Sequence, residues 1–379
     1  ATPAYSFTNA FTGLNGTAGD PNGNPVASFL LGYPSLGVIQ TYSNTGQIDW
    51  WQGYYVNDTF QVSRKLTVNV GVRWELPGVW AVRHDSGTTM LLGAPDPLSK
   101  TTGLNLVGQQ ALLNSSLYPD RHIMNRNFHL FSPRAGIAYR LNEKTVIRAG
   151  FGRSILPLSI QLGTSGSSSP VNVALTTMNS SANGFTPNDT TSNPFPNGIL
   201  TPMGRNPLYV NNIEGNSMNG GIPDAKFPDS LQWNFAIGRQ LPGNSSLDVS
   251  YSGNKGTHLA VGNINLNQLP NQYLSMGAAL VSTVPNPFFG KLPAGANSTL
   301  TGPTIRAGQL LRPFPQYINV TLASPYVGNA IYNSLQAKYQ KRFNAGGTIL
   351  VSYAWSKLIG TADGLSGFLE SQVGGIQDY

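Results

Sequence analysis

The stretch Leu66-Thr67-Val68-Asn69-Val70-Gly71-Val72-Arg73-Trp74-Glu75-Leu76 alternates without interruption between two kinds of residue. Its even positions are apolar, and its odd positions are polar or glycine. Because successive side chains of a β-strand point to opposite faces, this period of two predicts a strand with one apolar and one polar face. Such a strand is about 37 Å long and, tilted near 45°, covers about 26 Å, close to the apolar band of a membrane β-barrel.

The same pattern recurs in four hairpins, near residues 54–76, 131–156, 230–254 and 332–357. Their turns, at 63–65, 142–144, 241–244 and 344–347, are rich in residues that supply positive φ or side-chain caps. The connections near 77–130, 157–230 and 256–331 are much longer than the roughly 15 residues that compact domains tolerate. Short turns at one end and long loops at the other are typical of outer-membrane barrels.

The composition agrees with amphipathic strands and long polar loops. Charged residues make up 10% of the 379 residues, against about 25% in typical soluble domains. The net charge of +7 is not gathered into a basic run, so nucleic acid is not an expected partner. The chain has no cysteine, which excludes disulfides and thiolate metal sites. It also has no continuous apolar run long enough for a transmembrane helix, although barrel strands need only about 9–11 alternating residues.

The alternation of odd and even positions along each strand assigns the side chains of the hairpins to two faces. In a membrane barrel the apolar residues on one face of each strand contact outer-membrane lipid, and the polar residues on the other face point to the lumen. The residues predicted to face lipid are Val68, Val70, Val72, Ile137, Phe235, Val249 and Val351. Those predicted to face the lumen, where they could contact a plug or the ligand path, are Asn69, Arg73, Glu75, Arg134, Arg140, Arg148, Gln232, Asn234, Asp248, Gln336 and Lys338.

By the same alternation, three charged residues fall on the apolar face of their strands: Asp58, Arg239 and Lys341. Arg239 and Lys341 lie close to turns, where a charge can reach interfacial water at a cost of about 0–1 kcal/mol. Asp58 lies deeper in its strand. Either a bulge shifts its face, or the strand extends beyond the membrane at this point.

The chain shows no pattern that indicates catalysis or cofactor binding. It contains no P-loop, HExxH, GxSxG or Rossmann glycine pattern. His122 and His129 could contribute to a metal site, but solvated loop histidines are the better interpretation. The segment from Asp20 to Asn24 is a plain turn rather than a calcium loop, because Pro25 occupies the position that needs glycine. We therefore expect no enzyme activity, no catalytic residue, no metal site and no cofactor.

Parts of the long connections carry local signals. A short helix is expected from about Pro270 onward, and residues 316–322 could form a strand above the membrane. Residues 163–203 are rich in Ser, Thr, Asn and Pro and are expected to be irregular.

Several segments resemble the barrel of TonB-dependent outer-membrane receptors, in particular the Oar-like proteins of acidobacteria that carry a carboxypeptidase-regulatory-like domain. The matching segments occur in family order across nearly the whole chain. They are Ala27–Gly32, Tyr54–Phe60 with Leu66–Glu75, Ser132–Tyr139, Gln232–Asn234 through Leu241–Gly243, Asn267–Pro270, Val284–Phe288, Leu311–Gln316 and Tyr353–Lys357. Each segment is a weak signal, and their order makes the resemblance specific.

The resemblance implies a barrel of 22 strands in the bacterial outer membrane, filled by an N-terminal plug and energised through TonB. Family substrates include siderophores, cobalamin, glycans and peptides. The chain departs from this pattern, because no plug, TonB box or regulatory domain is recognisable, and we expect it to be cut at both ends. We therefore expect residues 1–379 to be a partial barrel, an all-β antiparallel meander of about 8–10 long strands that forms an open curved sheet.

The leading hypothesis is the barrel portion of a TonB-dependent receptor for a bulky nutrient of the siderophore, glycan or peptide class, with its own plug and TonB as partners. The substrate and the ligand-binding residues cannot be named from the sequence. A passive porin or an adhesin-like barrel is the first alternative, and a soluble secreted β-sandwich that binds glycans is the second. Detergent dependence separates the membrane classes from the soluble one.

Overall fold

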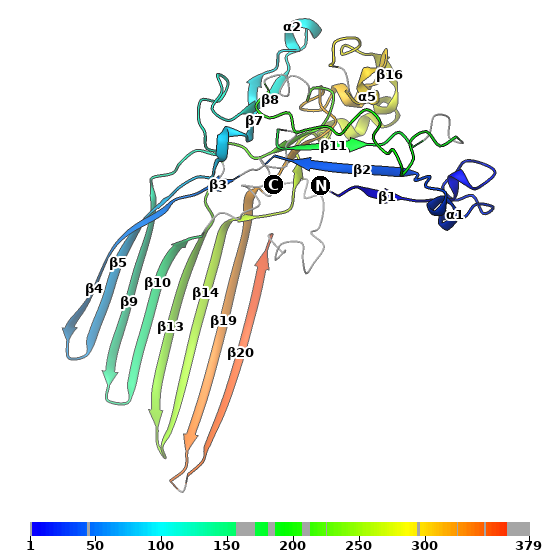
Figure 1. Ribbon diagram of the computed structural model, residues 1–379. Coiled ribbons are helices and arrows are strands. Elements are labelled where there is room, and N and C mark those ends of the chain that lie inside the picture. Colours follow the sequence, from blue (N-terminus) through cyan, green and yellow to red (C-terminus); the bar gives the residue numbers. More distant parts are fainter. Residues whose placement is uncertain are drawn as a thin grey trace.

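The computed structural model describes residues 2–43, 46–156, 171–180, 186–206, 213–224, 226–293, 296–323, 325–344 and 346–361. Its largest element is one antiparallel sheet with the strand order β20-β19-β14-β13-β10-β9-β5-β4 (Figure 1). Each strand pairs with its neighbours along the chain, so the sheet is the predicted meander. Its strands are β4 (Trp51–Ser63), β5 (Leu66–Pro77), β9 (Leu130–Asn142), β10 (Thr145–Ile155), β13 (Asp229–Leu241), β14 (Ser245–Ala260), β19 (Tyr326–Arg342) and β20 (Thr348–Gly360).

The four hairpin turns lie together at one end of this sheet, and the long connections lie at the other (Figure 1). Ser63 Oγ accepts hydrogen bonds from the backbone N–H groups of Lys65 and Leu66, at 3.2 and 3.1 Å. Gly243 and Asn244 have φ of 73° and 55°, the left-handed region that glycine and asparagine tolerate best. The turn residues therefore act as their sequence predicted.

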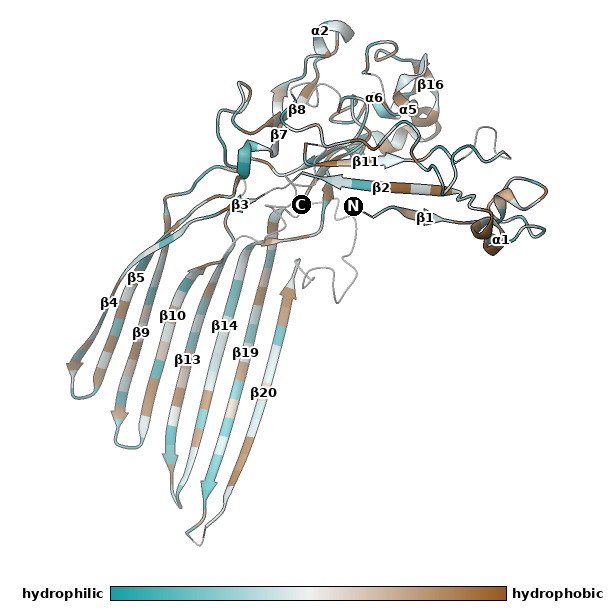
Figure 2. Ribbon diagram, in the orientation of Figure 1, coloured by the Kyte–Doolittle hydropathy of each residue, from teal (hydrophilic) through white to brown (hydrophobic). Residues whose placement is uncertain are grey.

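Hydrophobic and hydrophilic residues alternate along the long strands (Figure 2), and the strand register keeps the two kinds in separate rows. Direct partners in an antiparallel ladder point to the same face. One row of partners is apolar throughout: Phe60, Val68, Ile137, Ala149, Phe235, Tyr251, Leu335 and Trp355. The adjacent row carries only polar residues and glycine: Thr59, Asn69, Gly136, Gly150, Asn234, Ser252, Ser334 and Ser356.

The apolar face of the sheet is exposed. All but one of the residues predicted to face lipid are exposed, from 37% at Val249 to 57% at Val351, and Val68 is half-buried. The other sheets of the described part have only two or three strands and lie beyond the end of the long sheet (Figure 1). A soluble sandwich would bury such a face against a second sheet, so that alternative is wrong.

The sheet is open, as expected. Within the described residues, β4 and β20 each pair along one side only. Their free edges present unpaired backbone N–H and C=O groups, which cost several kcal/mol each in hydrocarbon. In a bilayer both edges therefore need partner strands.

Asp58 stays on the apolar face, opposite Val70. The register irregularity of this hairpin lies between Gln61 and Ser63, nearer the turn, so no bulge moves Asp58 to the polar face. The Asp58 carboxylate accepts a hydrogen bond from the Thr59 N–H at 2.7 Å.

An aromatic row marks the loop end of the apolar face. Tyr54, Trp74 and Phe131 are register partners, with ring centroids 6.2 and 6.1 Å apart. The Trp74 indole N–H donates to the Phe128 carbonyl at 2.8 Å. At the turn end, Lys341 Nζ lies 5.8 Å from the Phe343 ring centroid. Aromatic side chains at both ends of an apolar band are typical of the membrane–water interfaces of barrels.

The long connections fold into small elements above the sheet (Figure 1). The helices are short, and none in the described part is long and apolar enough to cross a membrane. The strands are β1 (Ala4–Ser6), β2 (Leu36–Tyr42), β3 (Gln47–Ile48), β6 (Ala81–Val82), β7 (Thr88–Pro95), β8 (Val107–Leu112), β11 (Val173–Thr177), β12 (Met218–Gly220), β15 (Ile264–Asn265), β16 (Thr283–Pro285), β17 (Thr304–Arg306) and β18 (Val320–Leu322). The helices are η1 (Asn9–Phe11), α1 (Pro25–Leu30), η2 (Arg83–Asp85), α2 (Ser99–Thr102), η3 (Asn271–Val281), α5 (Ser298–Thr301) and α6 (Ala307–Leu310).

Three local expectations are refined by this structure. The helix after Pro270 is the 3-10 helix η3, interrupted at Gly277 by a φ of 54°. The strand expected at 316–322 is shorter, since only Val320–Leu322 is extended and paired. The segment expected to be irregular contains β11, which pairs with β2, whereas its residues 163–170 and 181–185 lie outside the described part.

Replacing Val70 with arginine tests the assignment of the faces. If Val70 contacts the middle of the bilayer, Val70→Arg should destabilise the folded barrel in lipid by about 2–4 kcal/mol. Asn69→Arg is the matched control, since the neighbouring residue points to the polar face and should cost under about 1 kcal/mol. Urea titration of the full-length protein folded into vesicles measures both. Equal effects of the two substitutions would contradict the assignment.

Candidate functional site

The residues predicted to face the lumen all lie on the polar face of the sheet. Arg134, Gln232 and Asn234 line a shallow hollow of about 630 Å³ whose other residues belong mostly to this face. Asp248 and Lys338 are direct register partners on neighbouring strands, and Arg148 is paired with two alanines. The register therefore brings the predicted residues onto one surface, and their facing toward a lumen remains a prediction.

Arg73 and Glu75 form the best-defined ionic contact of this surface. Arg73 Nε donates to Glu75 Oε1 at 2.7 Å, and the Trp51 indole N–H donates to Glu75 Oε2 at 2.9 Å. Glu75 is buried at 6% exposure. Because both carboxylate oxygens are occupied, Glu75 holds Arg73 and the end of β4 in place and is not free to bind a solute.

Glycines on the polar face let long polar side chains lie flat against the sheet. A Cβ on Gly53 would clash with the Arg73 guanidinium, and one on Gly238 would lie 2.6 Å from Asp248 Oδ1. A Cβ on Gly150 would meet Asn234 Oδ1 at 2.8 Å. The glycine enrichment of this face therefore keeps the wall thin while its polar groups stay extended along it.

The apolar cores lie mainly in the loop assembly, by which we mean the described residues of the connections 78–129, 171–228 and 261–325. Three clusters of buried side chains occur there or at the loop ends of the strands. Phe288 and Leu300 are fully buried in one cluster, and Met218 and Val320 in another. No periodic pattern marks these residues, so the sequence did not reveal these cores.

Polar contacts join the three connections of the loop assembly. Gln316 Nε2 donates to Asp96 Oδ2 at 3.0 Å and to the Val107 carbonyl at 2.8 Å. The Tyr317 hydroxyl donates to the Gly108 carbonyl at 3.2 Å. The Gly215 N–H donates to the Gln316 carbonyl at 2.9 Å. Residues more than 200 positions apart in sequence are thus held together, and the loops form one folded unit rather than separate tethers.

Two carboxyl groups meet inside this unit. Asp96 is 2% exposed and Glu214 is 9% exposed, and the two side chains influence each other's charge. Burial, together with the negative charge of Asp96, raises the pKa of Glu214 to about 7. Burial also raises the pKa of Asp96, although hydrogen bonds from Leu98 and Gln316 act in the opposite direction. The Glu214 carboxyl therefore changes from its neutral to its ionised form near neutral pH, while it lies in the core of the loop assembly.

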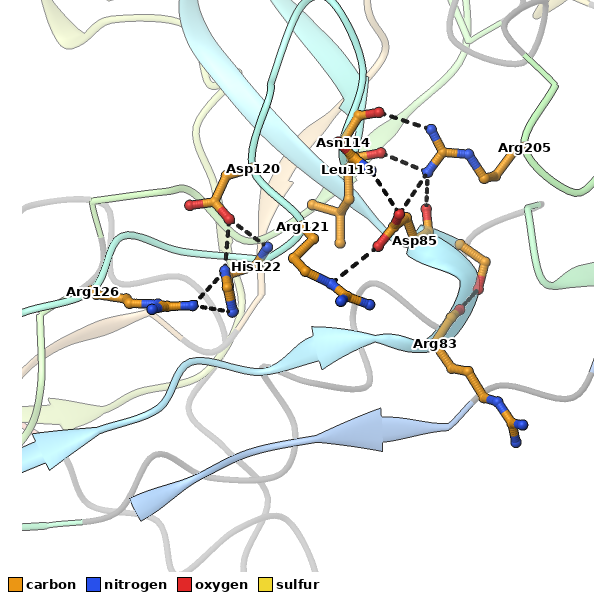
Figure 3. Close-up of polar contacts among 10 residues, drawn as sticks. Arg83, Asp85, Leu113, Asn114, Asp120, Arg121, His122, Arg126 and Arg205 are labelled. Atoms are coloured by element: carbon orange, nitrogen blue, oxygen red, sulfur yellow. Dashed lines mark hydrogen bonds and ion pairs between the residues drawn. The ribbon is translucent and has the colours of Figure 1, made fainter. Parts of the chain in front are cut away.

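The histidine predicted as a conceivable metal ligand is engaged in an ionic network (Figure 3). His122 Nδ1 lies 2.6 Å from Asp120 Oδ1, and Arg126 Nη2 lies 2.8 Å from His122 Nε2. Nearby, Asp85 is contacted by Arg121 at 3.4 Å and by Arg205 at 3.8 Å. His129 is exposed, and the described residues contain no group of three or more ligand-type side chains placed for a metal ion.

Asp20 organises the turn for which a calcium loop was considered. Its carboxylate accepts hydrogen bonds from the backbone N–H groups of Asn15 and Asn22, at 2.6 and 2.9 Å. These backbone bonds lower the pKa of Asp20. The carboxylate thus stabilises this turn.

The sequence profile of a family described as "Outer membrane beta barrel domain" matches residues 2–379. A comparison with curated protein sequences found no match. Among solved structures, the chain is similar to the alcaligin outer membrane receptor FauA from Bordetella pertussis, with 12% identity and a TM-score of 0.32 over 86% of this chain and 35% of that one.

Two further solved structures are similar. For the FrpB iron transporter from Neisseria meningitidis the identity is 9% and the TM-score 0.34, over 84% of this chain and 27% of that one. For the siderophore receptor PirA from Pseudomonas aeruginosa the identity is 10% and the TM-score 0.31, over 85% of this chain and 44% of that one. The chain spans less than half the length of each of these three proteins.

The carboxyl pair predicts that the loop assembly loosens as the pH rises. The raised pKa means that the folded state binds the Glu214 proton more tightly than the unfolded state, so stability is full below about pH 4.5 and falls until about pH 7. Hydrogen exchange at the Gly215 and Ile318 amides, corrected for intrinsic rates, should be on the order of tenfold to a hundredfold faster at pH 8 than at pH 5.

Glu214→Gln should abolish most of this pH dependence, because the amide stays neutral over the whole range. Glu143→Gln, at the turn end of the sheet, is the matched control and should behave like the parent protein. A pH response that is unchanged in Glu214→Gln would show that another group controls the loop assembly.

Proposed function

Because the chain belongs to the outer membrane beta barrel domain family, we propose that it forms wall and extracellular loops of a TonB-dependent receptor that takes up a bulky nutrient. The chain lies in the bacterial outer membrane, and its fold is an antiparallel β-barrel sheet. The proposed receptor is of the Oar-like type, and its substrate is of the siderophore, glycan or peptide class. It transports its substrate without transforming it.

One observation carries this proposal: a wall with a continuous polar face ends in a folded loop assembly with three apolar cores. Loops that carry cores and cross-loop hydrogen bonds present a shaped surface for a large ligand. A passive porin needs no such cores, because small solutes pass through its lumen without being recognised. The loop assembly is therefore the proposed ligand-capture region.

The cations of the polar face have a different proposed role. Arg134, Arg140 and Arg148 would contact the plug that fills the lumen in such receptors, together with Lys338. Ion pairs between plug and wall would hold the plug while the receptor is at rest and would release it when TonB exerts force. Arg73 contributes less, because the Glu75 carboxylate bonded to its Nε offsets its charge.

Planar-bilayer recordings of the full-length protein that carries this chain test the proposal. A plugged receptor should give no steady current in 1 M KCl, and the periplasmic domain of TonB should bind it. The double variant Arg134→Gln/Arg148→Gln should show frequent openings, because it weakens the contacts that hold the plug. Arg64→Gln, which removes the same kind of charge at a turn, is the control and should stay closed.

Two results would contradict the proposal. Steady open-channel currents in the parent protein, together with no TonB binding, would identify a passive porin. If the double variant showed as few channel openings as the Arg64→Gln control, these arginines would not hold a plug.

A further inference from the structure

A cavity of about 500 Å³ lies where the β4–β5 hairpin continues into the loop assembly. Its floor includes Gln52 and Leu76, which are register partners on the same face as Tyr54 and Trp74. The cavity therefore opens on the apolar face of the sheet, just above the aromatic row. It lies on the opposite face of the wall from Arg73 and Glu75.

A short ladder beyond the wall forms the upper side of this cavity. Ile48 pairs with Ala81, and Ala81 is bridged to His122, so these three residues share one face. Arg83 follows two residues after Ala81, and its backbone N–H donates to the Gly46 carbonyl at 2.7 Å. This extension of the ladder puts Arg83 and His122 on the cavity side of the molecule.

The charged residues that line the cavity are cationic. Arg83, Arg121 and Arg126 contribute to the lining, and no acidic residue of the described part does. Asp85 and Asp120 lie behind the lining, where they contact Arg121 and His122. The Arg83 guanidinium makes no ion pair or hydrogen bond to another described residue, and its side chain extends away from the network (Figure 3).

Apolar walls complete the cavity. Trp50 and Phe128 line it and are 72% and 54% exposed, and Leu76 and Val79 lie deeper. The aromatic row of Tyr54, Trp74 and Phe131 begins directly below, so an apolar surface runs from the cavity onto the exposed face of the sheet. A ligand that fits this site has an anionic head next to a hydrocarbon chain.

We propose that this cavity binds the phosphorylated headgroup of a lipid in the outer leaflet of the outer membrane. Arg83 and Arg126 stand at separate points of the lining, and their guanidinium groups bind phosphate groups of the head. Trp50 and Phe128 contact the first part of an acyl chain. This inference rests on the proposed lipid contact of the apolar face. At Gln52 and Leu76 the cavity lies on the opposite face of the sheet from the predicted lumen.

Native mass spectrometry of the full-length protein with added lipid A, which carries phosphates and acyl chains, tests this inference. The parent protein should retain lipid A, and Arg83→Gln/Arg126→Gln should bind it at least about tenfold more weakly, since each charge-assisted contact is lost. Arg64→Gln is the matched control and should bind like the parent. Inorganic phosphate should compete only weakly, because it lacks the acyl chain.

Two outcomes would overturn the inference. Equal lipid A binding by the parent and the double variant would show that the arginines do not form the site. Full competition by millimolar inorganic phosphate would identify a site for free anions. The facing of the sheet is tested separately: if Val70→Arg destabilises the barrel in lipid while lipid A binding fails, only the cavity assignment is wrong.

Discussion

The antiparallel ladder of the eight long strands is the constraint on which the rest of the structure depends. Because side chains alternate with a period of two, a slip of one residue between any two strands would exchange the faces of all strands beyond it. The observed register keeps an apolar row from Phe60 to Trp355 and a polar row from Thr59 to Ser356. The two faces exist only because every pair of neighbouring strands keeps this register.

The separation of faces moves the apolar cores away from the sheet. A soluble protein buries the apolar face of its sheet, whereas here this face is exposed and the buried clusters lie in the loop assembly and at the loop ends of the strands. In the proposed receptor, lipid takes the place of a core for the wall, and the loops need cores of their own because water surrounds them. Contacts such as Gln316 with Asp96 then join loops that the wall holds at the same end of the sheet.

The wall could be predicted from the sequence because a strand of a single-layer sheet depends mainly on its own alternation and its turns. The run from Leu66 to Leu76, the capped turn at Ser63 and the positive φ at Gly243 are all local features. The loop cores could not be predicted, since Met218 and Val320 meet only through the parallel pairing of β12 with β18. Nor could the cationic cavity, because Arg83 and Arg126 come to line the same cavity only through the bridge between Ala81 and His122.

The most direct test of the two-faced wall is a cysteine scan from Leu66 to Leu76 in the full-length protein, since this chain contains no cysteine of its own. Each variant, folded into vesicles, is treated with a charged, membrane-impermeant thiol reagent and, in parallel, with a lipid-soluble one. We expect labelling to alternate, with the lipid-soluble reagent favoured at even positions and the charged reagent at odd positions. Labelling that does not alternate would contradict a wall with lipid on one face and water on the other.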